Sequence, residues 1–295
     1  MYQSDVAELR RVLLRHPRDA FIGDARIDDQ WRDLNYLGRP DFDAACREAD
    51  AFATLLEKLG VVVEWMSESE DGGPRRDLGL DSLYVRDASV VTNAGVVLCR
   101  MGKPARAAEP EAQGTDFVDL GIHVAGTIDG EGTLEGGDVT WLSPELLAVG
   151  HGYRTNAEGI RQLTDLVGED VEVLEVGLPH WTGENDVMHL MSLVSPLAED
   201  LLLVYSRLLP VPFRKDLLNR GFELVEVPDA EWESQGCNVL AVAPRVAIAL
   251  DGNPETRRRM EAAGVTVHSI SGQEISMKGC GGPTCLTRPL ERAVG

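Results

Sequence analysis

The sequence lacks the features of three common classes of protein. Its five cysteines, at positions 46, 99, 237, 280 and 285, are an odd number without a CxxC pair, which argues against a disulfide framework or structural zinc site. The longest apolar stretch, residues 238–250, is interrupted by Pro244 and Arg245 and is too short to span a bilayer. No basic segment followed by an apolar one opens the chain. We therefore expect a cytoplasmic protein with no membrane partner.

The chain also has few cationic residues. Lys and Arg number 28 against 49 Asp and Glu, a net charge of −21. This excess argues against a nucleic-acid partner, because such binding needs cationic contacts to phosphate. It is compatible with steering of a cationic small molecule, although acidity that only keeps a protein soluble explains it equally well. With 295 residues, 43% of them hydrophobic, the chain is long enough for a large folded core.

What the sequence does contain is an internal repeat. A polar residue opens a short apolar strand, a turn follows, and a second apolar strand comes next. The polar residues are separated by 51, 51, 49 and 47 positions. They are Asp87, Asp138, His189, Asn238 and Cys285.

Several of these hairpins lead into a helix and a further strand. Residues 155–158 (TNAE) have the pattern of a capping box, and the helix that follows ends at Gly168. Helical spacing of apolar residues predicts another helix over residues 41–59. The segment after Arg100 has no clear helical pattern, and residues 23–40 and 183–186 look like loops, either of which could act as a lid. The repeating unit is thus strand–strand–helix–strand.

A unit of this size cannot bury its own apolar face, so radial packing of five units is expected. The fifth unit must combine the strand after Cys285 with the N-terminal strand ELRRVLL, the helix at 41–59 and the strand VVVEW. This pairing closes the ring and leaves no open edge between the first and last units. We therefore predict an α/β propeller with five blades, a single domain over residues 1–295, whose repeated strand starts bring the five polar residues together.

Three residues could carry covalent chemistry if they converge. Cys285 follows a glycine-rich loop that could expose its thiol, although a small buried residue is equally plausible there. Taken alone, His189 is more plausibly a structural histidine. Glu135, in LEGGD, is more plausibly a solvated carboxylate in a turn. The repeat changes this interpretation, because it predicts that all three meet.

These residues also match a known superfamily. The chain resembles the guanidino-group-modifying enzymes, which include arginine deiminase, dimethylarginine dimethylaminohydrolase and the amidinotransferases. The resemblance rests on six motifs in order: VAELRRVLLRHP at 6–17, LYVRD at 83–87, LEGGDV at 134–139, YRTNAEGI at 153–160, MHL at 188–190 and GGPTCLTRPLER at 281–292. Members of this superfamily have a five-bladed α/β propeller fold, in agreement with the repeat.

The resemblance implies a role for each candidate residue. Cys285 would attack the guanidinium carbon, His189 would move protons, and Glu135 would hold the geometry. The remaining candidates are expected at the substrate: Asp87 on the guanidinium, Asp81 beside it, Arg154 and Arg100 on an α-carboxylate, and Asp138, which more plausibly bonds turn amides. For Arg100 a surface arginine paired with an acid is a credible alternative. No metal or organic cofactor is needed.

The motifs depart from each subfamily in some way. Arginine deiminases usually carry HxD at the histidine, whereas the third position here is Met191. The dimethylarginine enzymes usually have Glu–Asp where this chain has Arg86–Asp87, and Arg86 is the arginine-deiminase choice. The chain also lacks the helical insertion common in arginine deiminases. Met191 could leave room for an alkylated nitrogen or pack in the core.

The prediction is therefore a hydrolase that cleaves a C–N bond of the guanidino group of arginine or an Nω-substituted arginine, nearest to the dimethylarginine dimethylaminohydrolases. Arginine deiminase-like activity and amidino transfer to an amine are the alternatives. A more distant one is a non-catalytic binding propeller, since a ribosome anti-association factor has a similar fold. The expected partner is a small guanidino compound; the sequence is also compatible with a homo-oligomer.

Overall fold

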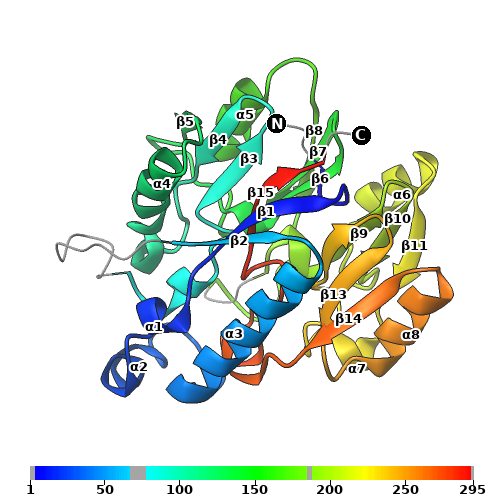
Figure 1. The fold of residues 1–295 in the computed structure, drawn as a ribbon. Coiled ribbons are helices and arrows are strands. Elements are labelled where there is room, and N and C mark those ends of the chain that lie inside the picture. The colour runs from blue at the N-terminus through cyan, green and yellow to red at the C-terminus, as the bar shows by residue number, and fades with distance from the viewer. Residues whose placement is uncertain (1–3, 67–77, 185–187, 294–295) are drawn as a thin grey trace.

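The computed structural model describes residues 4–66, 78–184 and 188–293, and these form five three-stranded sheets (Figure 1). In every sheet the first pair of strands is antiparallel and the second pair is parallel. The sheets are the blades of the predicted α/β propeller, so the predicted fold is confirmed.

Four of the blades are continuous in sequence, and each consists of three consecutive strands. They are β3 (Ser89–Thr92), β4 (Gly95–Leu98) and β5 (Val124–Thr127); β6 (Val139–Ser143), β7 (Leu146–His151) and β8 (Glu172–Gly177); β9 (Val194–Ala198), β10 (Leu201–Val204) and β11 (Glu223–Glu226); and β12 (Leu240–Ala243), β13 (Val246–Leu250) and β14 (Thr266–Ile270).

A helix joins the second and third strands of each blade, because a parallel neighbour can be reached only by a crossover connection. These helices are α3 (Phe42–Lys58), α4 (Glu109–Asp119), α5 (Ala157–Val167), α6 (Val211–Asn219) and α8 (Pro254–Ala262). Shorter helices are α1 (Pro17–Ala20), α2 (Asp24–Gln30) and α7 (Asp229–Trp232). Among the described residues, no helix is long and apolar enough to cross a membrane.

The fifth blade joins the two ends of the chain, as the repeat predicts. Strand β1 (Leu9–Leu14) lies between β15 (Arg288–Arg292), its antiparallel partner, and β2 (Val62–Trp65), its parallel partner. In Figure 1 the blue strand β1 and the red strand β15 lie side by side. Residues at both ends of the sequence are thereby held in one sheet.

Two local predictions are wrong, and one segment without a prediction is helical. The N-cap of α5 is Asn156, whose side chain accepts a hydrogen bond from the Gly159 amide, whereas the Thr155 hydroxyl bonds to Asp138. Helix α4 follows Arg100, where the sequence shows no clear helical pattern because much of the buried face of this helix is polar. Residues 23–40, expected as a loop, contain α2. The other expected loop, 183–186, lies partly outside the described residues.

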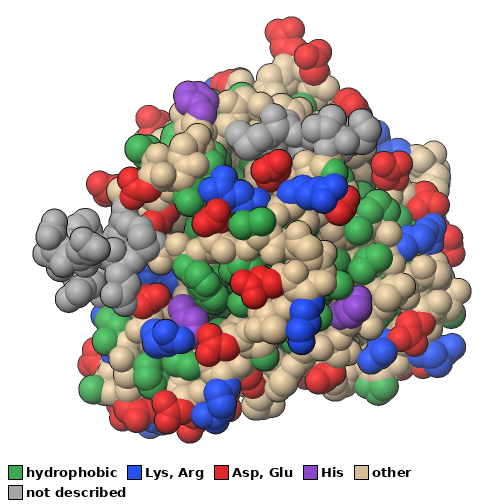
Figure 2. Space-filling model, in the orientation of Figure 1, with side chains coloured by type: hydrophobic (Ala, Val, Ile, Leu, Met, Phe, Trp, Pro, Cys, Tyr) green, Lys and Arg blue, Asp and Glu red, His purple; other side chains and the backbone are tan. Residues whose placement is uncertain are grey.

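The core lies between neighbouring blades. One cluster of buried residues joins Val97 of β4 to Leu147 and Val149 of β7, and Leu163 of α5 covers the same cluster. On the face shown in Figure 2, acidic and basic side chains are interspersed. Short helical turns precede the first strand of three blades: Leu80–Leu83, Gly136–Asp138 and Leu190–Ser192. These turns carry or adjoin the candidate residues Asp81, Asp138 and His189.

Candidate active site

One cavity gathers most of the predicted site residues. Cys285, His189, Asp87, Asp81 and Arg154 all line it, although their sequence positions span more than 200 residues. Glu135 lies directly behind His189 and is fully buried. The structure therefore brings Cys285, His189 and Glu135 together, as the repeat predicted.

Cys285 is held by the neighbouring blade. The side-chain amide of Asn238 donates a hydrogen bond from Nδ2 to Cys285 Sγ over 3.0 Å, and Asn238 Oδ1 accepts one from the Thr284 amide. A Cβ atom on Gly282 would lie 2.6 Å from the Asn238 side chain, so only glycine allows this approach. The glycines before the cysteine thus let the loop close around the amide that orients the sulfur.

His189 and Glu135 form a buried pair. Nε2 of His189 donates to Glu135 Oε2 over 2.8 Å, and Nδ1 lies 3.7 Å from Asp87 Oδ1. A Cβ atom on Gly137 would come within 2.4 Å of His189 Nδ1 and 2.7 Å of Asp87 Oδ1. The second glycine of LEGGD is therefore required by the close approach of these two side chains.

The charges around the imidazole favour its protonated form. Burial alone would lower the pKa of His189, but the carboxylates of Asp87, Asp138 and Glu135 outweigh it and raise the pKa to about 9. Burial would likewise raise the pKa of Glu135, and the hydrogen bond and charge of His189 lower it instead. These carboxylates thus favour the imidazolium form of His189 at neutral pH.

The surroundings of Cys285, in contrast, favour the neutral form of its side chain. Burial, with the nearby charge of Asp87, raises its pKa to about 11, even though the hydrogen bond from Asn238 acts in the other direction. Without a ligand the cysteine is a neutral thiol. A cation placed beside the sulfur would favour the thiolate.

Asp87 presents one free oxygen to the cavity. Its Oδ2 accepts a 2.5 Å bond from Arg106 Nη1, whereas its Oδ1 is buried without a hydrogen-bond partner. Arg106 is itself fixed by Glu109 and by the carbonyl oxygen of Tyr84. Arg106 therefore holds the carboxylate while leaving Oδ1 available for a donor.

Asp81 and Arg154 lie at other walls of the cavity. Asp81 Oδ2 accepts a 2.6 Å bond from Lys103 Nζ, which also donates to the Leu34 carbonyl oxygen. Arg154 Nη1 lies 3.4 Å from Glu135 Oε1. Arg154 and Asp81 thus line the same cavity as Cys285, each paired with an opposite charge of the protein.

Two further candidates do not reach the cavity. Asp138 is fully buried and accepts hydrogen bonds from the Leu190 amide and the Thr155 hydroxyl, the architectural position favoured for it. Arg100 is exposed and donates to the Gly132 carbonyl oxygen, because the strand alternation that buries Cys99 points the next side chain outward. The structure thus does not bring Arg100 to the site.

Sequence reasoning missed Lys103, Arg106 and the role of Asn238. Asn238 has the same position in the repeat as Cys285, so the repeat could have predicted that the two side chains meet. Lys103 and Arg106 lie in or next to a short helical turn, Pro104–Arg106, between β4 and α4, where the repeat has no anchor. Only the fold carries their side chains to Asp81 and Asp87.

Among the described residues, one group of acidic and histidine side chains has ligand atoms close enough to hold a metal ion. It consists of Asp87, Glu135 and His189, whose atoms lie within 4.8 Å of one another. The hydrogen bond from His189 to Glu135 and the ion pair from Arg106 to Asp87 already involve all three residues. The same three side chains are also close enough for proton transfer.

The five-bladed fold and the Cys–His–carboxylate site are those of a guanidino-modifying propeller. The family model for arginine deiminase matches residues 81–218 and 209–292, and the chain belongs to that family. An arginine deiminase from Rhodococcus jostii is 27% identical over 98% of this chain and 96% of its own length. Because that alignment runs over 395 positions, the relative carries insertions that this chain lacks.

Other relatives differ in what is known of them. An uncharacterized Bacillus subtilis protein, YkgA, is 29% identical over 74% of this chain and 73% of its own length. An arginine deiminase from Rhodococcus erythropolis is 28% identical over 71% of this chain, which spans 60% of the longer relative. The family assignment therefore rests on alignments at moderate identity that cover most of the chain.

Solved structures share the fold. The dimethylarginine dimethylaminohydrolase of Pseudomonas aeruginosa, in complex with citrulline, has a TM-score of 0.75 at 22% identity and covers 95% of this chain and 98% of its own. The N-terminal domain of ArgZ, a cyanobacterial arginine dihydrolase, has a TM-score of 0.80 at 18% identity and covers 97% and 98%. The expected superfamily and enzyme class, a C–N hydrolase acting on guanidino compounds, are confirmed.

Proposed function

We propose that this chain hydrolyses an Nω-substituted arginine, releasing the substituted amine and leaving citrulline, with Cys285 as the nucleophile. The observation that carries the proposal is the single cavity in which Cys285 and His189 face the unpartnered Oδ1 of Asp87. A guanidinium is the natural ligand for that oxygen, because it is planar, cationic and rich in N–H donors.

Binding of the substrate would also activate the nucleophile. The guanidinium would lie between Asp87 and the sulfur, where its positive charge favours the thiolate over the thiol. The Cys285 proton leaves to solvent as the thiolate forms, and Asn238 Nδ2 keeps its hydrogen bond to sulfur. The neutral thiol of the free protein is in this way protected from other electrophiles.

The reaction then takes two halves. The thiolate forms a bond to the guanidinium carbon, the C–N bond to the leaving amine breaks, and His189 supplies the proton that the amine requires. In the second half His189 takes a proton from water, whose oxygen attacks the amidino-thioether. The C–S bond breaks, Cys285 leaves as thiolate, and the ureido product is released after its protonated form loses a proton to solvent. Glu135 stabilises the imidazolium in both halves through its 2.8 Å hydrogen bond.

One feature supports a substituted nitrogen. Met191, at the position where arginine deiminases usually carry a second aspartate, is buried and does not line the cavity. One edge of the guanidinium is therefore left without a carboxylate, which suits a nitrogen that carries alkyl groups in place of N–H donors. Met191 packs in the core and does not itself provide the space.

Plain arginine is the second candidate, and the match to the arginine deiminase family supports it. Amidino transfer shares the first half-reaction and would differ only in the acceptor, an amine instead of water. A non-catalytic propeller would have no need for the Cys285, His189 and Glu135 arrangement.

The products decide among these functions. Wild type and Cys285→Ala would be incubated with asymmetric dimethylarginine, arginine and agmatine, and the products measured by mass spectrometry. Citrulline with dimethylamine supports the proposal, whereas citrulline with ammonia from arginine alone favours deimination. Covalent protein without product, released only when an amine is added, would favour transfer. No product and no covalent protein with any of the three would overturn the proposal.

A further inference from the structure

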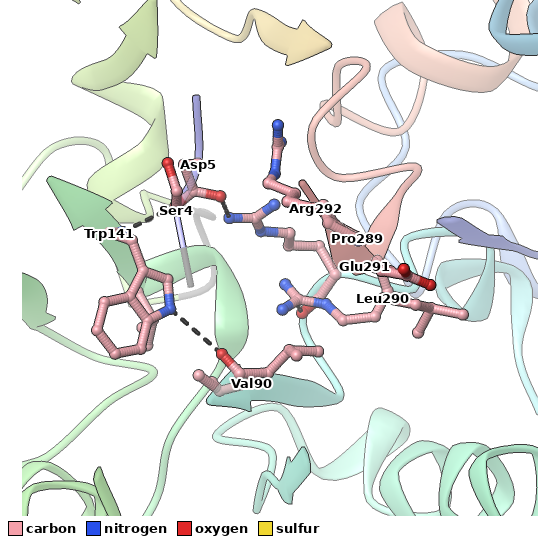
Figure 3. A pocket seen from close by; sticks show the side chains of 12 residues that line it. Ser4, Asp5, Val90, Trp141, Pro289, Leu290, Glu291 and Arg292 are labelled. Atoms are coloured by element: carbon pink, nitrogen blue, oxygen red, sulfur yellow. Dashed lines mark hydrogen bonds and ion pairs between the residues drawn. The ribbon is translucent and has the colours of Figure 1, made fainter. Parts of the chain in front are cut away.

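A second cavity, which shares no lining residue with the one that holds Cys285, has three buried arginines in its wall. Arg86, Arg288 and Arg292 surround it together with Asp5, and Trp141 lies at its wall (Figure 3). Arg86 lies just before β3, whereas Arg288 and Arg292 belong to β15 at the C-terminal end of the chain. None of their side chains is more than slightly exposed.

The charges in this cavity do not balance. Asp5 is the one buried carboxylate that lines it, and its two oxygens are already used: Oδ1 accepts from Arg86 Nη2 over 2.8 Å, and Oδ2 accepts from the Trp141 amide and the Thr140 hydroxyl. Glu291 also lines the cavity, but its side chain is exposed and points away from Asp5 in Figure 3. Three guanidinium groups thus share one buried counter-charge, which leaves an excess of two positive charges.

Several N–H groups of these arginines have no hydrogen-bond acceptor among the described residues. They are Nε and Nη1 of Arg86, Nε of Arg288 and Nε of Arg292. Their other nitrogens are used by the fold: Arg288 Nη2 donates to the Arg86 carbonyl oxygen, and Arg292 donates to the carbonyl oxygens of Ala7 and Ala241. A buried donor without an acceptor is costly, and more so when it is charged.

The buried position of the cluster also affects the pKa of two of its arginines, Arg288 and Arg292. Burial, with repulsion from Arg86, lowers the pKa of Arg288 to about 9 and acts on Arg292 in the same direction, with Asp5 opposing it. Even so, both remain protonated at neutral pH. Water could accept the free N–H groups, but it would leave the excess charge in place.

We propose that this arginine cluster, Arg86, Arg288 and Arg292, binds a monovalent anion of halide size, chloride under ordinary conditions. An anion accepts the free N–H groups and also neutralises charge, which water cannot do. The free space is about 20 Å³, room for one species of roughly water size and too little for a phosphate or an organic acid. The proposal is independent of the proposed function, because it concerns binding at a separate cavity.

The position of the cluster links it to the active site. The Arg86 amide donates to the Cys285 carbonyl oxygen over 3.1 Å, and Arg86 directly precedes Asp87. The charge of Arg86 favours the Cys285 thiolate. A bound anion would screen that charge, so chloride is expected to move formation of the thiolate to higher pH.

Thermal unfolding in chloride and in gluconate tests the site. Sodium chloride would replace sodium gluconate at constant ionic strength, because gluconate is too large for the cavity. The melting temperature of wild type is expected to rise saturably by roughly 2–4 °C, as binding to the folded state alone predicts. Equal melting temperatures in the two salts would overturn the proposal.

Variants locate the effect. Arg288→Met removes one charge from the cavity and should abolish the chloride-dependent rise. Arg15→Met, which changes an equally buried arginine outside the cavity, should retain it. A rise of wild-type size in Arg288→Met would refute the assignment. If Arg288→Met does not fold, a wild-type crystal grown in sodium bromide answers the question: an anomalous peak among the three arginines supports the site, and its absence there contradicts it.

Discussion

Asn238 and Cys285 lie just before the first strands of consecutive blades and meet through a 3.0 Å hydrogen bond from Nδ2 to Sγ. This contact joins two equivalent positions of the repeat and directs an amide donor at the nucleophile. Asn238→Asp replaces the donor by a negative charge. We expect the thiolate of Cys285 to form at higher pH and kcat/KM to fall by about 100-fold, the usual cost of losing one preorganised donor.

The pH dependence of iodoacetamide alkylation at Cys285, followed by peptide mass spectrometry, measures this effect. Wild type should be alkylated faster with rising pH up to about 11. Asn238→Ser, which removes the amide without adding charge, is the matched control and should lie between the two. Identical alkylation profiles for Asn238→Asp and wild type would show that the contact does not act on the sulfur.

The glycine at 137 gives a steric prediction. Gly137→Ala places a methyl group where His189 Nδ1 and Asp87 Oδ1 lie, and neither can move without losing its own buried partner. We expect kcat/KM to fall by about 100-fold or more. Gly177→Ala is the control, because no heavy atom lies within 4 Å of the added carbon. Equal activity of the two variants would contradict the geometry described for His189.

Stability should depend on pH through His189. Its pKa is raised in the folded protein, so the ionised pair with Glu135 contributes fully below pH 6.5, the ordinary value, and the contribution is lost as the pH rises through about 9. For Glu135 the sign is reversed: its lowered pKa gives stability that is lost as the pH falls below its ordinary value of 4.5.

Melting temperatures of wild type and His189→Gln between pH 6 and 10 test this dependence. The difference between them should be largest near pH 6 and should shrink by a few degrees by pH 9–10. A difference that stays constant over this range would mean that His189 is not protonated in the folded protein.

Arg154 and Arg100 form a natural pair for comparison. Arg154 lines the cavity and Arg100 does not, although both were candidates for the substrate α-carboxylate. Arg154→Gln should raise KM for a substrate with an α-carboxylate by about 10-fold or more, and Arg100→Gln should leave it near the wild-type value. Steady-state kinetics of the two variants would settle this, and equal effects would restore Arg100 as a substrate contact.

The repeat explains why much of this architecture was readable from sequence. Anchors about fifty residues apart predicted the blades, the closure of β15 on β1 and the meeting of Cys285 with His189. Residues that lie between the anchors, such as Lys103 and Arg106, could not be placed from the sequence. The wrong cap at Thr155 has the same origin, because its hydroxyl is taken by Asp138, a contact between segments that local spacing does not encode.

The central claim is that Cys285 forms a covalent bond to the substrate carbon. The most direct test is mass spectrometry of intact protein quenched in acid during turnover of asymmetric dimethylarginine, followed by peptide mapping. The account predicts a mass increase equal to the substrate less its leaving amine, located on Cys285 and absent from Cys285→Ala. Turnover without any adduct on Cys285, or undiminished turnover by Cys285→Ala, would contradict it.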